Sequence, residues 1–185
     1  MRVRLEWIAP AGAAALATPP GWPADRSRWT GVAIDVLRAT STLTVALANG
    51  AANVVPLAEP SEALKLRDRV PGTLACGERD GRRMPRFDLG NSPLEYTRER
   101  VAGRTLAFAS TNGSRALQSL AGCAGIVLAS WLNISAVARR LAGASAFVRV
   151  VCAGQLGAFS IEDSACAGWL CAALARGGAR LEGAA

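Results

Sequence analysis

The amino-acid sequence predicts an α/β protein with a mostly parallel sheet and helices on both of its faces. The first observation is a regular alternation, from Trp29 onward, of short apolar runs with longer segments of helical period. The second is length, because 185 residues fall within the usual range of one domain and can bury a core. Strands that alternate with helices need crossover connections, which make neighbouring strands parallel. We therefore expect residues 1–185 to form a single domain.

The predicted elements follow one another at intervals that suit this architecture. Polar and apolar residues alternate over 2–8, which predicts a first strand, and the stretch 11–28, rich in Ala, Pro and Gly, is predicted to be a loop. Apolar runs bounded by turn residues predict further strands over residues 30–36, 53–58, 73–76, 104–109, 125–129 and 146–152. Apolar residues at helical spacing predict helices over residues 41–48, 61–69, 114–120, 135–141 and 162–176. Residues 180–185 complete no obvious element.

The interval 77–103 interrupts this alternation. It is charged and irregular, and its polar residues are short and specific in type. Long irregular loops within compact domains are usually functional or disordered. We interpret this one as functional.

Composition excludes several classes of function. The formal charge is +7, but the basic residues are scattered, are all arginine apart from Lys65, and lack an interleaved aromatic stripe, so we expect no nucleic-acid partner. Five cysteines without a CxxC pair indicate reduced thiols, and no stretch is long enough to span a bilayer, so we expect a cytoplasmic protein that does not contact a membrane. The absence of histidine excludes His-dependent triads and His metal sites.

The stretch from Asp35 to Thr42 is the most informative part of the chain, because a buried strand there turns into a helix. A helix start offers free backbone N–H groups to an anion, and the adjacent hydroxyl groups add further donors. Asp35 is a hard oxygen ligand that suits a divalent cation, and Arg38 has the planar donor group that suits phosphate oxygens. An ordinary capped helix start beside an ion pair explains the same residues equally well.

Other polar clusters also follow predicted strands. They are Glu78–Arg79, residues 110–115, Asn133, Gly154 and then Glu162–Asp163. Ligands of open parallel sheets bind beyond the carboxyl ends of the strands. We therefore expect these clusters to meet at one edge of the sheet and to bind a small anionic substrate.

Each cluster also has a simpler interpretation. The turn at residues 111–114 could be an ordinary strand-to-helix connection, and Glu162 and Asp163 could only complement a helix dipole. Cys76 and Arg82 have the C-x5-R spacing of thiol phosphatases, but two carboxylates lie between them where a phosphate cradle needs bare backbone donors. We therefore do not favour a thiol mechanism.

Three motifs taken together resemble one family, the 2-phosphosulfolactate phosphatases. They are Ile34-Asp35-Val36-Leu37-Arg38-Ala39-Thr40-Ser41-Thr42, Phe87-Asp88-Leu89-Gly90-Asn91-Ser92-Pro93 and Ser110-Thr111-Asn112-Gly113-Ser114-Arg115-Ala116. The resemblance runs from about Trp29 to about Leu174. It implies a three-layer α/β/α fold, a homodimer, magnesium dependence and hydrolysis of (2R)-2-phospho-3-sulfolactate to (2R)-3-sulfolactate and phosphate, a step of coenzyme M biosynthesis in methanogens.

The sequence departs from the family pattern at three places. Arg86 stands where the family usually has Gly, Ser110 replaces a common Thr, and the chain ends earlier than family members do, which leaves open that a C-terminal segment is missing.

The site expected from the sequence has three parts. The residues expected to act in catalysis are Asp35, Arg38 and Glu78. The residues expected to bind the substrate are Thr40, Arg79, Asn91, Ser92, Thr111, Asn112 and Gly113. The residues expected to hold Mg²⁺ are Asp35, Glu162 and Asp163. A non-catalytic anion-binding module, or a phosphatase of the same fold acting on another phosphorylated hydroxy acid, remains an alternative.

Overall fold

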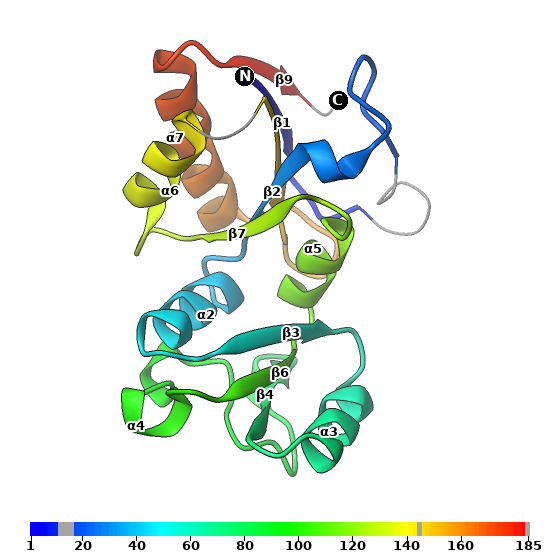
Figure 1. Cartoon of the computed structure of the whole chain (residues 1–185), viewed down its shortest axis with the longest axis vertical. Helices are drawn as coiled ribbons and strands as arrows, with labels where there is room; N and C mark the ends of the chain where they lie inside the picture. The colour runs from blue at the N-terminus through cyan, green and yellow to red at the C-terminus, as the bar shows by residue number, and fades with distance from the viewer. Residues whose placement is uncertain (11–16, 144–145, 184–185) are drawn as a thin grey trace.

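The computed structural model describes residues 1–10, 17–143 and 146–183, and its strands form two sheets (Figure 1). The large sheet has the order β7-β2-β8-β1-β9 and is parallel throughout. Its strands are β1 Arg2–Glu6, β2 Trp29–Ile34, β7 Gly125–Ala129, β8 Phe147–Cys152 and β9 Arg180–Gly183. The small sheet has the order β3-β6-β4-β5, and only β5 is antiparallel to its neighbour. Its strands are β3 Asn53–Leu57, β4 Thr73–Arg79, β5 Arg82–Arg83 and β6 Thr105–Ala109.

Helices cover both sheets, so the α/β class and the mostly parallel strands are confirmed. The helices are α2 Ala39–Ala48, α3 Pro60–Arg69, α4 Arg98–Val101, α5 Gly113–Ser119, α6 Ile134–Ala142 and α7 Ile161–Arg176, with short 3-10 turns η1 Arg26–Arg28 and η2 Pro93–Glu95. In Figure 1, α6 and α7 lie against the large sheet, α2 and α5 lie between the two sheets, and α3 lies beyond the small sheet.

Alternation along the strands explains these layers, because successive side chains of a strand point to opposite faces. In β2, Val32 and Ile34 pack with the buried residues of α6 and α7, whereas Ala33 packs into the layer between the sheets. In β6, Leu106 and Phe108 enter that same layer, whereas Ala107 and Ala109, which alternate with them, face α3. The layer of α2 and α5 therefore serves as the core of both sheets.

The division into two sheets is a feature that the alternation of elements does not specify. Local periodicity identifies strands, but pairing depends on contacts between distant residues. Strand β7 has the predicted bounds, and the other predicted strands and helices are found with ends shifted by one to three residues.

The C-terminal residues are the clearest correction. Residues 180–183, for which the sequence indicates no element, form β9 and pair with β1 in parallel register. Backbone pairing with β1, rather than apolar side chains, defines this strand, since only Leu181 is a large apolar residue. Part of the predicted loop 11–28, residues 11–16, lies outside the described residues. No helix in the described part of the chain is long and apolar enough to cross a membrane.

Candidate active site

A cleft of about 490 Å³ opens where strands of both sheets end. Residues that follow β2 and β8 of the large sheet face residues that follow β4 and β6 of the small sheet. The described residues that line the cleft are Asp35, Leu37, Arg38, Glu78, Asp80, Gly81, Asn91, Thr111, Asn112, Gly154, Gln155, Leu156, Ser160, Glu162 and Asp163. The predicted meeting of distant polar clusters at one edge therefore occurs, but between two sheets. Asn133 takes no part in it, because its amide accepts from the Ser130 N–H and donates to the Leu128 carbonyl.

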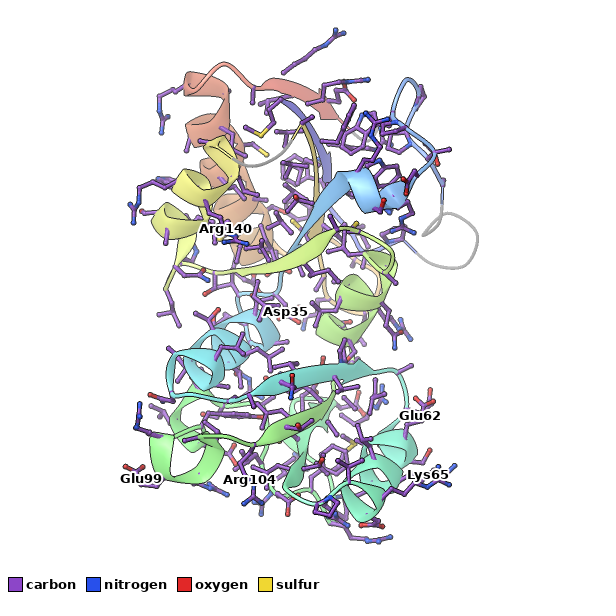
Figure 2. The ribbon with its side chains drawn as sticks, in the orientation of Figure 1. Asp35, Glu62, Lys65, Glu99, Arg104 and Arg140 are labelled. Atoms are coloured by element: carbon purple, nitrogen blue, oxygen red, sulfur yellow. The ribbon has the colours of Figure 1, made fainter. Side chains whose placement is uncertain are left out.

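Asp35 follows β2 directly and lies in the middle of the molecule, beside α2 (Figure 2). Only 7% of its surface is exposed. Its Oδ1 accepts a hydrogen bond from the Ala39 N–H at 3.1 Å. Burial, together with the negative charges of Asp163 and Glu78, raises the pKa of Asp35 to about 7. A positive charge that enters the cleft would therefore stabilise the ionised form of Asp35.

Thr40 fixes the backbone on either side of Asp35. The Thr40 hydroxyl accepts from the Asp35 N–H at 2.9 Å and lies 2.7 Å from the Ala129 carbonyl oxygen at the end of β7, to which it can donate. Thr40 is buried and does not line the cleft. Thr40 thus holds the end of β2 beside Asp35, and its expected part in binding substrate stays a prediction.

Gly113 supports Asp35 from the other side. A Cβ at this position would lie 2.6 Å from Asp35 Oδ2 and 2.4 Å from the Ala39 Cβ, so only glycine fits. The start of α5 therefore approaches the start of α2 closely beside the carboxylate. Gly113 shapes the site through this backbone approach.

Glu78 joins two loops of the small sheet. Its Oε1 accepts from the Thr111 N–H at 2.7 Å, and its Oε2 accepts from the Gly81 N–H at 2.7 Å. Arg38 donates to the Gly81 carbonyl at 2.9 Å and so brings the large-sheet side into the same network. Two of the residues expected to act in catalysis thus meet at Gly81.

Asp163 joins the ends of two strands of the large sheet. Its Oδ1 accepts from the Val36 N–H at 2.8 Å, just beyond β2, and its Oδ2 accepts from the Gly154 N–H at 3.2 Å, just beyond β8. Burial raises its pKa to about 6, against the effect of these hydrogen bonds. Glu162, the neighbouring residue in the first turn of α7, lies half-buried in the cleft wall.

A tight turn after β8 contributes Gln155 and Leu156 to the lining of the cleft. Gln155 and Ala158 exchange backbone hydrogen bonds at 2.9 Å, and Leu156 between them has a φ of 51°. The Leu156 N–H donates to Asn112 Oδ1 at 3.0 Å. Asn112 belongs to the connection between β6 and α5, so this hydrogen bond links the loops of the two sheets.

Arg79 and Ser92 do not line the cleft. Arg79 follows Glu78 in β4 and therefore points to the opposite face, where it donates to the Ala58 carbonyl at 3.3 Å. Ser92 is half-buried and precedes η2. Because successive side chains of a strand point to opposite faces, the sequence could have indicated that Glu78 and Arg79 do not face the same cleft.

Sequence reasoning also missed several residues of the cleft. Asp80, Gln155, Leu156 and Ser160 line it. Gln155 follows Gly154 directly after a predicted strand, which was the available signal. No local sequence pattern identifies Asp80 as a cleft residue, because its turn is held by the hydrogen bond that Glu78 accepts from the Gly81 N–H.

The donor set of the cleft suits magnesium. No group of three or more Cys, Asp or Glu side chains in the described ranges is arranged to hold a metal ion by itself. Mg²⁺, however, typically uses one or two carboxylates and completes its shell with waters and phosphate oxygens. The buried, like-charged pair Asp35 and Asp163 provides such hard oxygen ligands, so the residues present fit the ion.

Comparison with known proteins decides the family. A family model described as 2-phosphosulpholactate phosphatase matches residues 16–185. The chain belongs to the 2-phosphosulfolactate phosphatase family. The resemblance carried by the three sequence motifs is thereby confirmed.

Curated relatives bear the same family name. The chain is 47% identical over 140 residues to a probable 2-phosphosulfolactate phosphatase of Caldanaerobacter subterraneus subsp. tengcongensis, which covers 74% of this chain and 58% of that protein. It is 47% identical over 139 residues to the Thermotoga petrophila protein of that description, covering 75% and 60%. For the Symbiobacterium thermophilum protein the identity is 48% over 139 residues, covering 74% and 60%. The chain thus spans about three fifths of the length of these phosphatase relatives.

Proposed function

We propose that the chain is a magnesium-dependent phosphatase that hydrolyses (2R)-2-phospho-3-sulfolactate to (2R)-3-sulfolactate and phosphate. The observation that carries this proposal is the cleft in which Asp35, Asp163 and Glu78 lie with Arg38 at the strand ends of both sheets. The family of the chain and the names of its relatives support the same substrate.

The proposed mechanism assigns a task to each part of the cleft. Asp35, with Asp163 or Glu162, would hold Mg²⁺, which when bound supplies positive charge that stabilises the transferring phosphoryl group and the leaving oxygen. Arg38 and the turn at residues 111–113 would bind the phosphate oxygens. Glu78 would position both phosphate-binding loops through its hydrogen bonds to Thr111 and Gly81. These groups orient the phosphate ester for displacement and keep its charge within the cleft.

The order of bond formation is left open between two routes. Water attacks the phosphorus directly, or Asp35 attacks first and a phosphoenzyme is then hydrolysed. Rapid acid quench with ³²P-labelled substrate separates them, because only the second route leaves label on the protein.

The decisive experiment measures phosphate release by the purified chain. We expect release from phosphosulfolactate to exceed that from phospholactate and phosphoglycerate, and chelation with EDTA to stop it until Mg²⁺ is restored. Release that favours another phosphorylated hydroxy acid would replace the substrate assignment. Binding of phosphosulfolactate without any release would identify a non-catalytic anion-binding module.

The proposal also includes the biological setting that the family resemblance implies. We propose a cytoplasmic homodimer that acts in coenzyme M biosynthesis or in related sulfolactate metabolism. Light scattering of the purified chain tests the dimer, with a monomer mass as the contradicting result.

A further inference from the structure

The cleft contains far more negative than positive charge. Of the described residues that line it, five carry carboxylates and one, Arg38, carries a guanidinium group. The substrate proposed above brings roughly four more negative charges at neutral pH, from its phosphate, carboxylate and sulfonate groups. Like charges repel strongly in a partly desolvated cleft. A single divalent cation offsets only a small part of this excess.

The carboxylates belong to two separate parts of the framework. Asp35 follows β2 and Asp163 joins the ends of β2 and β8 in the large sheet, whereas Glu78 lies near the end of β4 in the small sheet. The side chains in the described ranges nowhere gather three acids around one ion. A second cation beside Glu78 would offset negative charge that an ion held by Asp35 and Asp163 leaves in the cleft.

Asn91 supplies an independent observation on the small-sheet side. Leu89 forms a parallel bridge with Cys76, and two residues further along these neighbouring segments Asn91 and Glu78 both line the cleft. Asn91 is 6% exposed, and its buried Oδ1 has no hydrogen-bond partner among the residues that the structure describes. A buried acceptor without a donor costs about 1–3 kcal/mol, which a ligand at this position would offset.

The loop that carries Asn91 is held firmly. The Gly90 N–H donates to Glu95 Oε2 at 2.9 Å, and the Tyr96 hydroxyl donates to the Gly90 carbonyl at 2.7 Å. Tyr96 is itself fully buried. The backbone that carries Asn91 at the cleft wall is therefore held in place in advance of any ligand.

We propose that Glu78 and Asn91 hold a second divalent cation, on the small-sheet side of the cleft and distinct from the cation proposed for Asp35. Carboxylate and amide oxygens are both hard ligands, and waters and phosphate oxygens complete the shell of such an ion. The anionic oxygens of the substrate are acceptors, so they cannot partner an amide oxygen directly. The inference rests on the proposed function only for the charge of the substrate.

The test counts Mn²⁺ ions, as a spectroscopic substitute for Mg²⁺, bound per chain by equilibrium dialysis in the presence of inorganic phosphate. We expect two ions for the unaltered chain and one for Asn91→Leu, which keeps the size but removes the oxygen. Asn91→Asp retains an oxygen and adds charge, so it should bind the second ion about tenfold more tightly. Asn53→Leu, at an exposed position in β3, is the matched control and should keep two ions.

One ion or none in the unaltered chain, or two ions with full affinity in Asn91→Leu, would overturn the proposal. The second result would mean that Asn91 supplies no ligand to a cation. If Asn91→Leu does not fold, an unchanged affinity in Asn91→Asp has the same consequence. The ion count does not depend on turnover. Two bound ions without phosphate release would contradict only the proposal that the chain is a phosphatase. One bound ion with magnesium-dependent release would contradict only the proposal of a second cation.

Discussion

At the scale of single residues, the cleft is built from carboxylates that backbone N–H groups hold in place. Glu78 and Asp163 each accept two such hydrogen bonds from different segments, and Asp35 accepts one from the start of α2. These carboxylates therefore organise the strand ends as well as providing charge. The burial of Asp35 and Asp163 gives the site a cost in stability that depends on pH.

Replacement of Asp35 by Asn tests its cost in stability and its role in phosphate release separately. Asp35→Asn should abolish magnesium-dependent phosphate release, because the ligand charge is lost, while the amide oxygen can still accept from the Ala39 N–H. It should also stabilise the ion-free chain. The pKa of Asp35 rises from 3.8 to about 7 on folding, so between these pH values the unfolded chain loses a proton that the folded chain retains.

The stabilisation by Asp35→Asn should therefore depend on pH. The unfavourable contribution of Asp35 to the stability of the ion-free chain is absent below about pH 4, grows as pH rises toward 7, and is complete above it. Removal of the charge should therefore restore up to about 4 kcal/mol at pH 8 and less at pH 5. Urea unfolding with EDTA at both pH values measures the gain. An equal gain at pH 5 and pH 8, or normal turnover in the variant, would contradict the role of Asp35.

At the scale of elements, α2 contains two buried threonines with opposite expected effects. The Thr40 hydroxyl joins the Asp35 backbone to the Ala129 carbonyl, whereas the Thr42 hydroxyl is buried without a partner in the described part of the chain. Thr40→Val should therefore cost about 1–3 kcal/mol of unfolding free energy and reduce turnover, since both backbone groups lose their partner. Thr42→Val should be neutral or stabilising. Thermal unfolding and phosphate release are compared for the two variants, and equal losses would show that the Thr40 hydrogen bonds are unimportant.

Elements with a strong local pattern could be predicted from sequence, and those defined by partners could not. Strand β7 and the start of α7, which Ser160 caps, carry their own signals. Strand β9 is short and largely polar, and only its pairing with β1 defines it. The placement of Asp35, Glu78 and Asp163 followed from strand ends, whereas the roles of Thr40 and Arg79 depend on which side chain faces inward. That Thr40 and Arg79 bind substrate stays a prediction, and neither residue lines the cleft.

At the scale of the whole molecule, the two sheets share one apolar layer. Leu43 of α2 packs there with Ala33 of the large sheet and Phe108 of the small sheet. Leu174 of α7, by contrast, packs only with the large sheet and its helices. Whether the chain behaves as one domain therefore depends on this middle layer.

A pair of truncations tests that dependence. Leu43→Ala should cost about 2–5 kcal/mol and raise amide hydrogen exchange in both sheets, because each loses part of its core. Leu174→Ala should have a similar cost with exchange raised first in the large sheet. Exchange that rises in only one sheet in Leu43→Ala would indicate two independent folding units.

The placement of the cleft has a consequence for how such a protein can change. Most of the lining comes from connections after β2, β4, β6 and β8, whereas most of the buried apolar residues lie within the strands and helices themselves. Substitutions or insertions in one connection can thus alter which ligand is accepted while the other three stay in register. Diversification of ligand preference within this architecture needs no rebuilding of its interior.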